Sequence, residues 1–125
     1  EEVGRVTRGY WGMRRLSGAE VEDNTLRWDR FRTTMLTFMD DYDAILCPVD
    51  HQPAVPHGTD DPMQFAYTLA WSLTGWPCVV LRAGTSPEGL PINVQIVARP
   101  WREDVAIAVG LEVEKLFGGW QPATL

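Results

Sequence analysis

Three short apolar segments constrain the fold more than any other feature of this sequence. Residues 44–47 and 78–81 are apolar throughout, and residues 92–98 alternate between buried and exposed residue types as a strand does. Strands that are apolar on both faces need layers packed above and below them, so these segments predict buried strands in an α/β fold. Three such strands are few for a complete sheet. Because the chain also opens without an initiator Met, we expect it to be a segment of a longer protein.

Three other segments have the pattern of helices. Apolar residues recur at steps of three and four in residues 19–41, which predicts a helix that lays one face on a core. Residues 65–73 predict a second helix, followed by a glycine and a proline that end it. Residues 103–117 predict a third, with acidic residues in its first turn and Gly118 after its last. The expected apolar stripe of the first helix consists of Trp28, Phe31, Met35, Phe38 and Tyr42.

The segments between these elements are rich in proline and glycine. Residues 49–62 contain three prolines, which forbid a regular helix and favour an extended loop of fixed path. Loops of that length in compact domains are often functional. Residues 83–91 contain two prolines and two glycines and predict a turn. Residues 1–18 have little pattern, so we expect an irregular lead-in and then one α/β segment over residues 19–125.

Composition and charge argue against several functions. A net charge of −6 leaves no basic face for a nucleic acid. No apolar run approaches the ~20 residues that cross a membrane, and no secretory leader is visible. Cys47 and Cys78 lie in apolar segments, which favours buried thiols in the cytoplasm, although one bridge between them stays possible. We expect no cofactor, because the sequence contains no phosphate-binding loop and no dinucleotide fingerprint.

Few residues of this chain have the chemistry of a hydrolase. Its serines are Ser17, Ser72 and Ser86, and none lies in a Gly-x-Ser-x-Gly elbow. Lys115 is the only lysine and lies at the end of a charged helix. A lysine that acts as a general base must be desolvated, and this position is the wrong environment. We therefore expect no catalytic residue in this chain.

Both histidines lie in the proline-rich loop. Asp50, His51 and His57 have side chains that bind metals, and a histidine there could act as a base beside a nearby cysteine. Their spacing matches no metal motif, and no further histidine remains to complete a site. We expect solvated loop histidines and no metal site. The acidic residues between 40 and 43 are interpreted as the polar end of a helix that leads into a strand.

Four motifs, in order, resemble the C-terminal portion of the amidase-signature family. Residues 41–48, DYDAILCP, are similar to the family's YDxLLTP junction, and residues 67–77, YTLAWSLTGWP, are similar to its YTxPFNLTGxP helix exit. Residues 89–98, GLPINVQIVA, are similar to GLPVGLQLVG, and PWRED at residues 100–104 completes the series. Each motif is short, but four in the right order form a specific signal. The sequence departs from the commoner Thr, Asn and Gly of the family at Cys47, Ser72 and Asn93.

The resemblance implies a mixed sheet wrapped by helices and the hydrolysis of a carboxamide C–N bond by two serines and a lysine. In the family those residues lie upstream, and nothing here matches the Gly/Ser-rich segment that contains them. The C-terminal part supplies one wall of the substrate cleft instead. This places Phe65 and Leu69 on the cleft-facing side, with Met63 and Thr68 beside them, and favours an apolar acyl group or an arylalkyl amide. The alternative is that Phe65 and Leu69 pack in the core.

Two other functions stay possible at this point. The parent protein could be an amidotransferase subunit that acts on aminoacyl-tRNA, although the apolar pair at Phe65 and Leu69 counts against an amino-acid-like substrate. The chain could also be a non-catalytic module that associates with itself. An incomplete sheet exposes strand edges and apolar surface, so we expect a homo-oligomer, and a clean monomer in sedimentation would contradict that expectation.

The inventory of nucleophiles generates one test. The purified chain is expected to hydrolyse amides no faster than buffer does, because it lacks the serines and the lysine that the resemblance requires. Product release from a panel of aliphatic and aryl amides measures this. Robust turnover that disappears when a serine is replaced by alanine would show that the inventory is misread.

Overall fold

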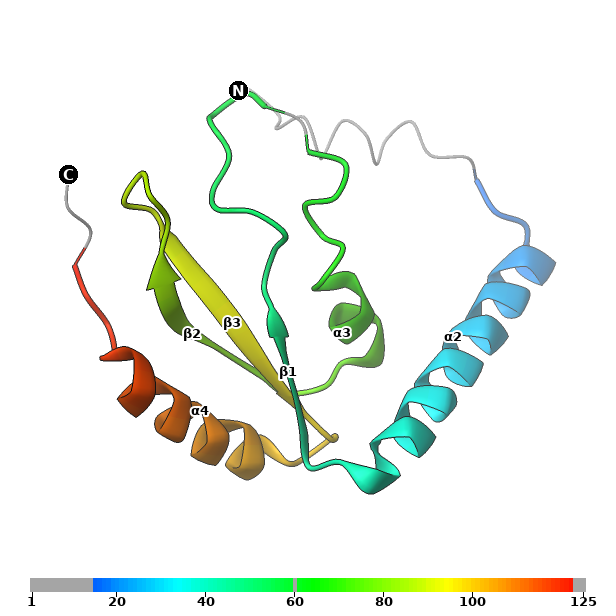
Figure 1. The fold of residues 1–125 in the computed structure, drawn as a ribbon. Helices are drawn as coiled ribbons and strands as arrows, with labels where there is room; N and C mark the ends of the chain where they lie inside the picture. Colours follow the sequence, from blue (N-terminus) through cyan, green and yellow to red (C-terminus); the bar gives the residue numbers. More distant parts are fainter. Residues whose placement is uncertain (1–14, 60, 123–125) are drawn as a thin grey trace. The chain divides into compact units, whose positions relative to one another are not determined.

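Figure 1 shows the chain in a computed structural model that describes residues 15–59 and 61–122. Its contacts form two units, Glu1–Arg30 and Phe31–Leu125. The described part of the first unit is the beginning of helix α2, Gly18–Phe38. None of the helices in the described ranges is both long and apolar enough to cross a membrane.

Helix α2 begins with a capping box. The Ser17 hydroxyl accepts a hydrogen bond from the Glu20 amide at 3.3 Å, and the Glu20 carboxylate accepts one from the Ser17 amide at 2.8 Å. This reciprocal arrangement satisfies two N–H groups that the first turn of a helix leaves without partners. The start of the helix is therefore one residue from the predicted start. Residues 1–14, most of the predicted lead-in, lie outside the described residues.

The expected apolar stripe of this helix is only partly covered. Trp28, Phe38 and Tyr42 are each about half exposed, and no described residue of α2 is fully buried. Met35, near the end of the helix, is the member that packs against a core cluster. The prediction that the whole stripe lies on a core is wrong, since periodicity shows which side of a helix is apolar but not what covers it.

Three antiparallel strands form the sheet, in the order β1-β3-β2. The strands are β1 Ala44–Pro48, β2 Cys78–Thr85 and β3 Pro91–Ala98. The α/β class is confirmed, but of the three strands expected to be buried only β3 has a neighbour on both sides among the described residues. Leu46 of β1 and Val80 of β2 are more than half exposed. An apolar run in the sequence does not reveal whether its strand lies at the centre or at an edge.

The turn between β2 and β3 is shorter than predicted. Strand β2 continues to Thr85, and the turn occupies only residues 86–90. The Ser86 amide donates to the Leu90 carbonyl at 2.8 Å, and the Leu90 amide donates back to the Ser86 hydroxyl at 3.2 Å. Ser86 is buried in this turn, so its hydroxyl has a structural role.

One face of the sheet is covered by helix α4, Glu103–Phe117, as Figure 1 shows. Ile96 and Ala98 of β3 pack there against Ala106 and Val113 of the helix. At Gly110 the helix comes so close to the sheet that an added Cβ would lie 3.1 Å from Cγ1 of Val79. The helix ends at Gly118, whose φ of 79° is the left-handed conformation that glycine adopts without strain. Both ends agree with the prediction.

The opposite face is covered by the short helix α3, Leu69–Thr74, and by the 3-10 helix Met39–Asp41. Met39, Trp76 and Val97 form the buried cluster there, and the Trp71 ring stacks on Trp76 at a centroid distance of 6.4 Å. The predicted helix over residues 65–73 is wrong at its start, because residues 62–68 form consecutive turns and the α-helix begins only at Leu69.

Gln95, in the middle of β3, connects this face to the loop. Its side chain is 2% exposed, which agrees with the predicted inward position. The Nε2 amide donates one hydrogen bond to the Pro48 carbonyl and one to the Tyr67 carbonyl, each at 2.8 Å. The Oε1 atom accepts a weaker bond from the Cys78 thiol at 3.5 Å. One buried amide therefore joins the end of β1, the turns before α3 and the start of β2.

Replacement of Gln95 by leucine tests this connection. Gln95→Leu should lower the free energy of unfolding by about 1–3 kcal/mol, because two backbone carbonyls lose their donor inside the protein. Urea unfolding followed by tryptophan fluorescence measures the change. Gln64→Leu, at an exposed glutamine, is the matched control and should stay within about 0.5 kcal/mol of the parent chain. Equal stability of both variants would contradict the role of Gln95.

Candidate functional site

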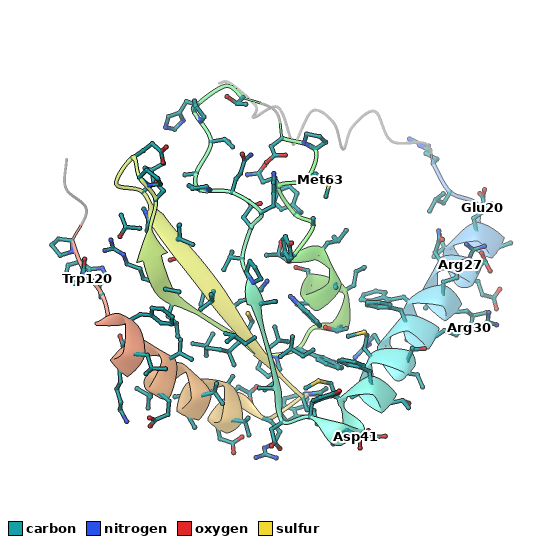
Figure 2. All side chains as sticks on the ribbon, viewed as in Figure 1. Glu20, Arg27, Arg30, Asp41, Met63 and Trp120 are labelled. Atoms are coloured by element: carbon teal, nitrogen blue, oxygen red, sulfur yellow. The ribbon has the colours of Figure 1, made fainter. Side chains whose placement is uncertain are left out.

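The candidate site is the segment that leaves β1 and returns to α3. The Val49 amide donates to the Asn93 carbonyl at 3.3 Å and so extends the pairing of β1 with β3 by one bond. Beyond it the chain follows a proline-rich path with a turn in which the Thr59 amide donates to the Pro56 carbonyl. Figure 2 shows the side chains along this path, with Met63 labelled near its end. The segment contains all four residues that the sequence nominates for substrate binding.

Three of these four residues present apolar side chains to the surface. Met63 is 53% exposed, Phe65 58% and Leu69 57%, whereas Thr68 is half-buried. None of them belongs to either core cluster, so core packing does not explain Phe65 and Leu69. Three large apolar side chains exposed within seven residues form an apolar patch, and patches of this kind mark sites where something else binds.

Backbone hydrogen bonds fix the positions of these side chains. The Leu69 amide donates to the Phe65 carbonyl at 2.9 Å, which places the two side chains one turn apart on one side. The Ala66 amide donates to the Met63 carbonyl at 2.9 Å. The Tyr67 carbonyl between them faces inward to Gln95. The buried amide therefore holds the back of the segment while its apolar side chains face outward.

A polar cluster lies at the two ends of the loop that precedes this patch. Nδ1 of His51 lies 2.8 Å from Oδ1 of Asp50, and Nε2 lies 3.5 Å from Oδ2 of Asp61. Asp61 also accepts hydrogen bonds from the Gln52 side chain at 2.7 Å and from the Met63 amide at 2.9 Å. The Met63 amide, followed by the Gln52 amide and the positive field of His51, lowers the pKa of Asp61 despite an opposing effect of burial.

Sequence reasoning found two members of this cluster and missed the third. Asp50 and His51 were natural candidates, but Asp61 is ten residues further along and has no motif around it. His57, the other candidate, is exposed. The loop path brings Asp61 back to His51, and only a structure shows such a path. The bond from the Met63 amide to Asp61 is the one local signal, since Asp often binds the backbone amide two residues ahead.

The remaining reactive residues do not come together in the described part of the chain. Ser17 precedes α2, Ser72 lies in α3, Ser86 lies in the β2–β3 turn, and Lys115 lies in α4. The Lys115 ammonium is paired with Glu112 at 2.6 Å, as expected for a surface lysine.

The two cysteines are free. Cys47 is half-buried and Cys78 is exposed, so the prediction of two buried thiols is wrong for Cys78. Local burial of part of the side chain nevertheless raises the pKa of the Cys78 thiol, and the nearby Cys47 raises it further. Because the thiolate is the reactive form, this environment does not favour a nucleophile at Cys78.

A larger hollow lies elsewhere, beside the free edge of β2. Its volume is about 750 Å³, and its walls include Val80, Leu90 and the largely exposed Trp120, which is labelled in Figure 2. No serine, histidine or cysteine lines it. The hollow therefore offers room without reactive groups, and the proline-rich segment is the better candidate site.

Comparisons with known proteins place these features in a wider context. The sequence model of the Amidase family matches residues 12–106. Human fatty-acid amide hydrolase 2 is 41% identical over 59 residues, which make up 47% of this chain and 11% of that protein. A glutamyl-tRNA(Gln) amidotransferase subunit of Nitrobacter winogradskyi is 29% identical over 119 residues, which make up 86% of this chain and 24% of that protein.

Solved structures agree on the fold. The crystal structure of an amidase superposes with a TM-score of 0.76 and 25% identity, over 82% of this chain and 26% of that one. The structure of 6-aminohexanoate cyclic dimer hydrolase superposes with a TM-score of 0.71 and 21% identity, over 82% of this chain and 25% of that one. This chain therefore spans about a quarter of each of these two structures.

The environment of Asp61 generates a prediction about pH. A carboxyl group whose pKa is lowered by folding stabilises the folded chain above its unfolded pKa of about 3.9, and this contribution is lost as the pH falls through the lower folded value. Asp61→Asn should therefore lose less stability than the parent chain does between pH 6 and pH 2. Urea unfolding in EDTA at several pH values measures the slopes.

Gln52→Ala is the matched variant, because it removes a donor to Asp61 without removing an ionisable group. Its acid-induced loss of stability should lie between those of the parent chain and Asp61→Asn. A parent chain and an Asp61→Asn variant with the same pH profile would show that Asp61 does not titrate differently in the folded state.

Proposed function

Because this chain belongs to the Amidase family, we propose that it forms a substrate-facing wall of an enzyme that hydrolyses a carboxamide C–N bond. The observation that carries the proposal is the exposed apolar patch of Met63, Phe65 and Leu69, which precedes and opens α3. Such a patch on an ordered segment suits one side of a cleft whose other sides come from elsewhere in the enzyme.

The chemistry of the patch indicates the class of substrate. Its three large side chains are apolar, and the half-buried Thr68 adds one hydroxyl. Burial of such a side chain against a ligand contributes at most about 1.5–3 kcal/mol, and part of that gain is offset by the loss of freedom on binding. An apolar acyl group or an arylalkyl amide would gain from these contacts. A substrate carboxylate beside them would lose hydration without gaining a partner.

The bond-breaking residues are proposed to be two serines and a lysine that this chain does not contain. The positions of its own serines and lysine support this, because they lie on separate elements and Ser86 and Lys115 already have structural or ion-pair partners. On this proposal the isolated chain is inactive. It works in the cytoplasm, where its two free thiols would remain reduced.

The amidotransferase relatives support a second candidate function. The relative from Nitrobacter winogradskyi matches more of this chain than human fatty-acid amide hydrolase 2 does, although at lower identity. A protein of that kind would act on a charged, amino-acid-like group. None of Met63, Phe65 and Leu69 provides the charged partner that such a group requires, so we place this candidate second. Glutamine-dependent amidation of an aminoacyl-tRNA by the native protein would reverse the order.

Self-association is the third candidate. The free edges of β1 and β2, together with exposed Leu46 and Val80, give the isolated chain a surface that favours pairing with another copy. We therefore propose that the isolated chain forms a homo-oligomer. Sedimentation velocity over a range of concentrations tests this directly, and a monomer at every concentration would contradict it.

Substitution of the apolar patch tests the proposed wall. In the native gene product that carries this sequence, Phe65→Ala and Leu69→Ala should each lower kcat/KM for an apolar amide by about tenfold, equivalent to about 1.4 kcal/mol. Steady-state hydrolysis of an apolar amide and of a carboxylate-bearing amide measures the effect, which should be confined to the apolar substrate. Leu116→Ala, at a leucine 79% exposed on α4, is the control and should leave both rates unchanged. Unchanged rates in the patch variants would reject the wall.

A further inference from the structure

Three side chains that can bind a metal converge at the two ends of the proline-rich loop. Asp50, His51 and Asp61 each offer one ligand atom, and these atoms all lie within 4.8 Å of one another. Asp50 and His51 follow β1 directly, whereas Asp61 lies just before the apolar patch. A site formed by these residues would therefore join the start of the loop to its end.

The contact with Asp50 prepares His51 to bind a cation through Nε2. Nδ1 of His51 lies 2.8 Å from Oδ1 of Asp50, a hydrogen-bond distance that favours the proton on Nδ1. The lone pair is then on Nε2, on the side of the ring that faces Asp61. Histidines that bind metals commonly donate their other ring N–H to a carboxylate in this way, which fixes the tautomer and the ring orientation.

The distance on the other side of the ring suits a cation better than a hydrogen bond. Nε2 of His51 and Oδ2 of Asp61 are 3.5 Å apart, beyond the usual 2.7–3.2 Å range of an N–H···O bond. Zinc bonds of about 2.0–2.1 Å to nitrogen and oxygen at a tetrahedral angle place the two ligand atoms about 3.4 Å apart. The gap between the two residues is therefore close to one edge of a zinc tetrahedron.

Asp61 is already held in place by its surroundings. Its side chain is 8% exposed, and its two oxygens accept hydrogen bonds from the Gln52 side chain and the Met63 amide. A ligand carboxylate must be ionised, and these donors keep it so. The cation would meet a carboxylate whose position is fixed, and the ordering of that side chain would not oppose binding.

We propose that His51 and Asp61 bind a divalent transition-metal cation of the zinc class, with Asp50 as the residue that orients His51. One imidazole nitrogen among the ligands favours zinc, cobalt or nickel over magnesium or calcium, which prefer oxygen ligands alone. With two protein ligands the remaining positions belong to water, so the site has moderate affinity and open coordination. A bound cation would fasten the loop next to Met63.

Zinc binding to the isolated chain tests the proposal without any assay of amide hydrolysis, so its outcome is independent of the proposed enzyme function. After removal of metals with EDTA and dialysis, titration calorimetry with zinc chloride should show one saturable site. His51→Ala and Asp61→Asn should each weaken binding by at least tenfold, and Asp50→Asn should weaken it by about tenfold through loss of orientation. His57→Ala is the matched control and should bind as the parent chain does, because this exposed histidine is not part of the cluster.

A measurement on the unaltered chain guards against variants that fail to fold. In nitrogen-detected NMR, zinc should shift the Nε2 resonance of His51 and leave that of His57 in place. Two results would overturn the proposal: the absence of saturable zinc binding by the parent chain, or a loss of binding in His57→Ala as large as that in His51→Ala. In the first case the cluster is an ion pair in which a protonated His51 lies between two carboxylates.

Discussion

The amide of Gln95 is the interaction on which the arrangement of this chain depends. It lies in the central strand, is almost completely buried, and donates to two carbonyls from segments 47 and 28 residues away in sequence. A buried amide in such a place has to be satisfied, and only one path of the loop brings both carbonyls to it. The hydrophobic faces of the sheet provide most of the driving force for folding, whereas Gln95 selects where the proline-rich loop returns.

That selection determines what the surface presents. Because the Tyr67 carbonyl faces inward, the turns on either side of it carry Met63, Phe65 and Leu69 outward, and the chain reaches α3 only after the patch. The same return path brings Asp61 next to His51. The apolar patch and the polar cluster are therefore two consequences of one loop path, which explains why the proposed wall and the proposed cation site adjoin each other.

The sequence predicts those features that depend on local chemistry. Periodicity and glycine placement locate α4 and its end, alternation locates β3 and the inward direction of Gln95, and four motifs identify the family. The departures come from information that is not local. Val80 and Leu46 have the residue types of a core but lie in strands with a free edge, and the aromatic stripe of α2 lacks a cover along most of its length. The late start of α3 and the approach of Asp61 to His51 depend on tertiary hydrogen bonds, which no spacing in the sequence reveals.

The central claim is that this chain contacts the substrate of an amidase without supplying the residues that cleave it. Photo-crosslinking tests it most directly: the native gene product is irradiated with an apolar amide that carries a photoreactive group, and the adducts are mapped by peptide mass spectrometry. The account predicts adducts on Met63, Phe65 or Leu69, which competing unlabelled amide suppresses. Adducts that fall only outside residues 63–69, with the same competition, would contradict it.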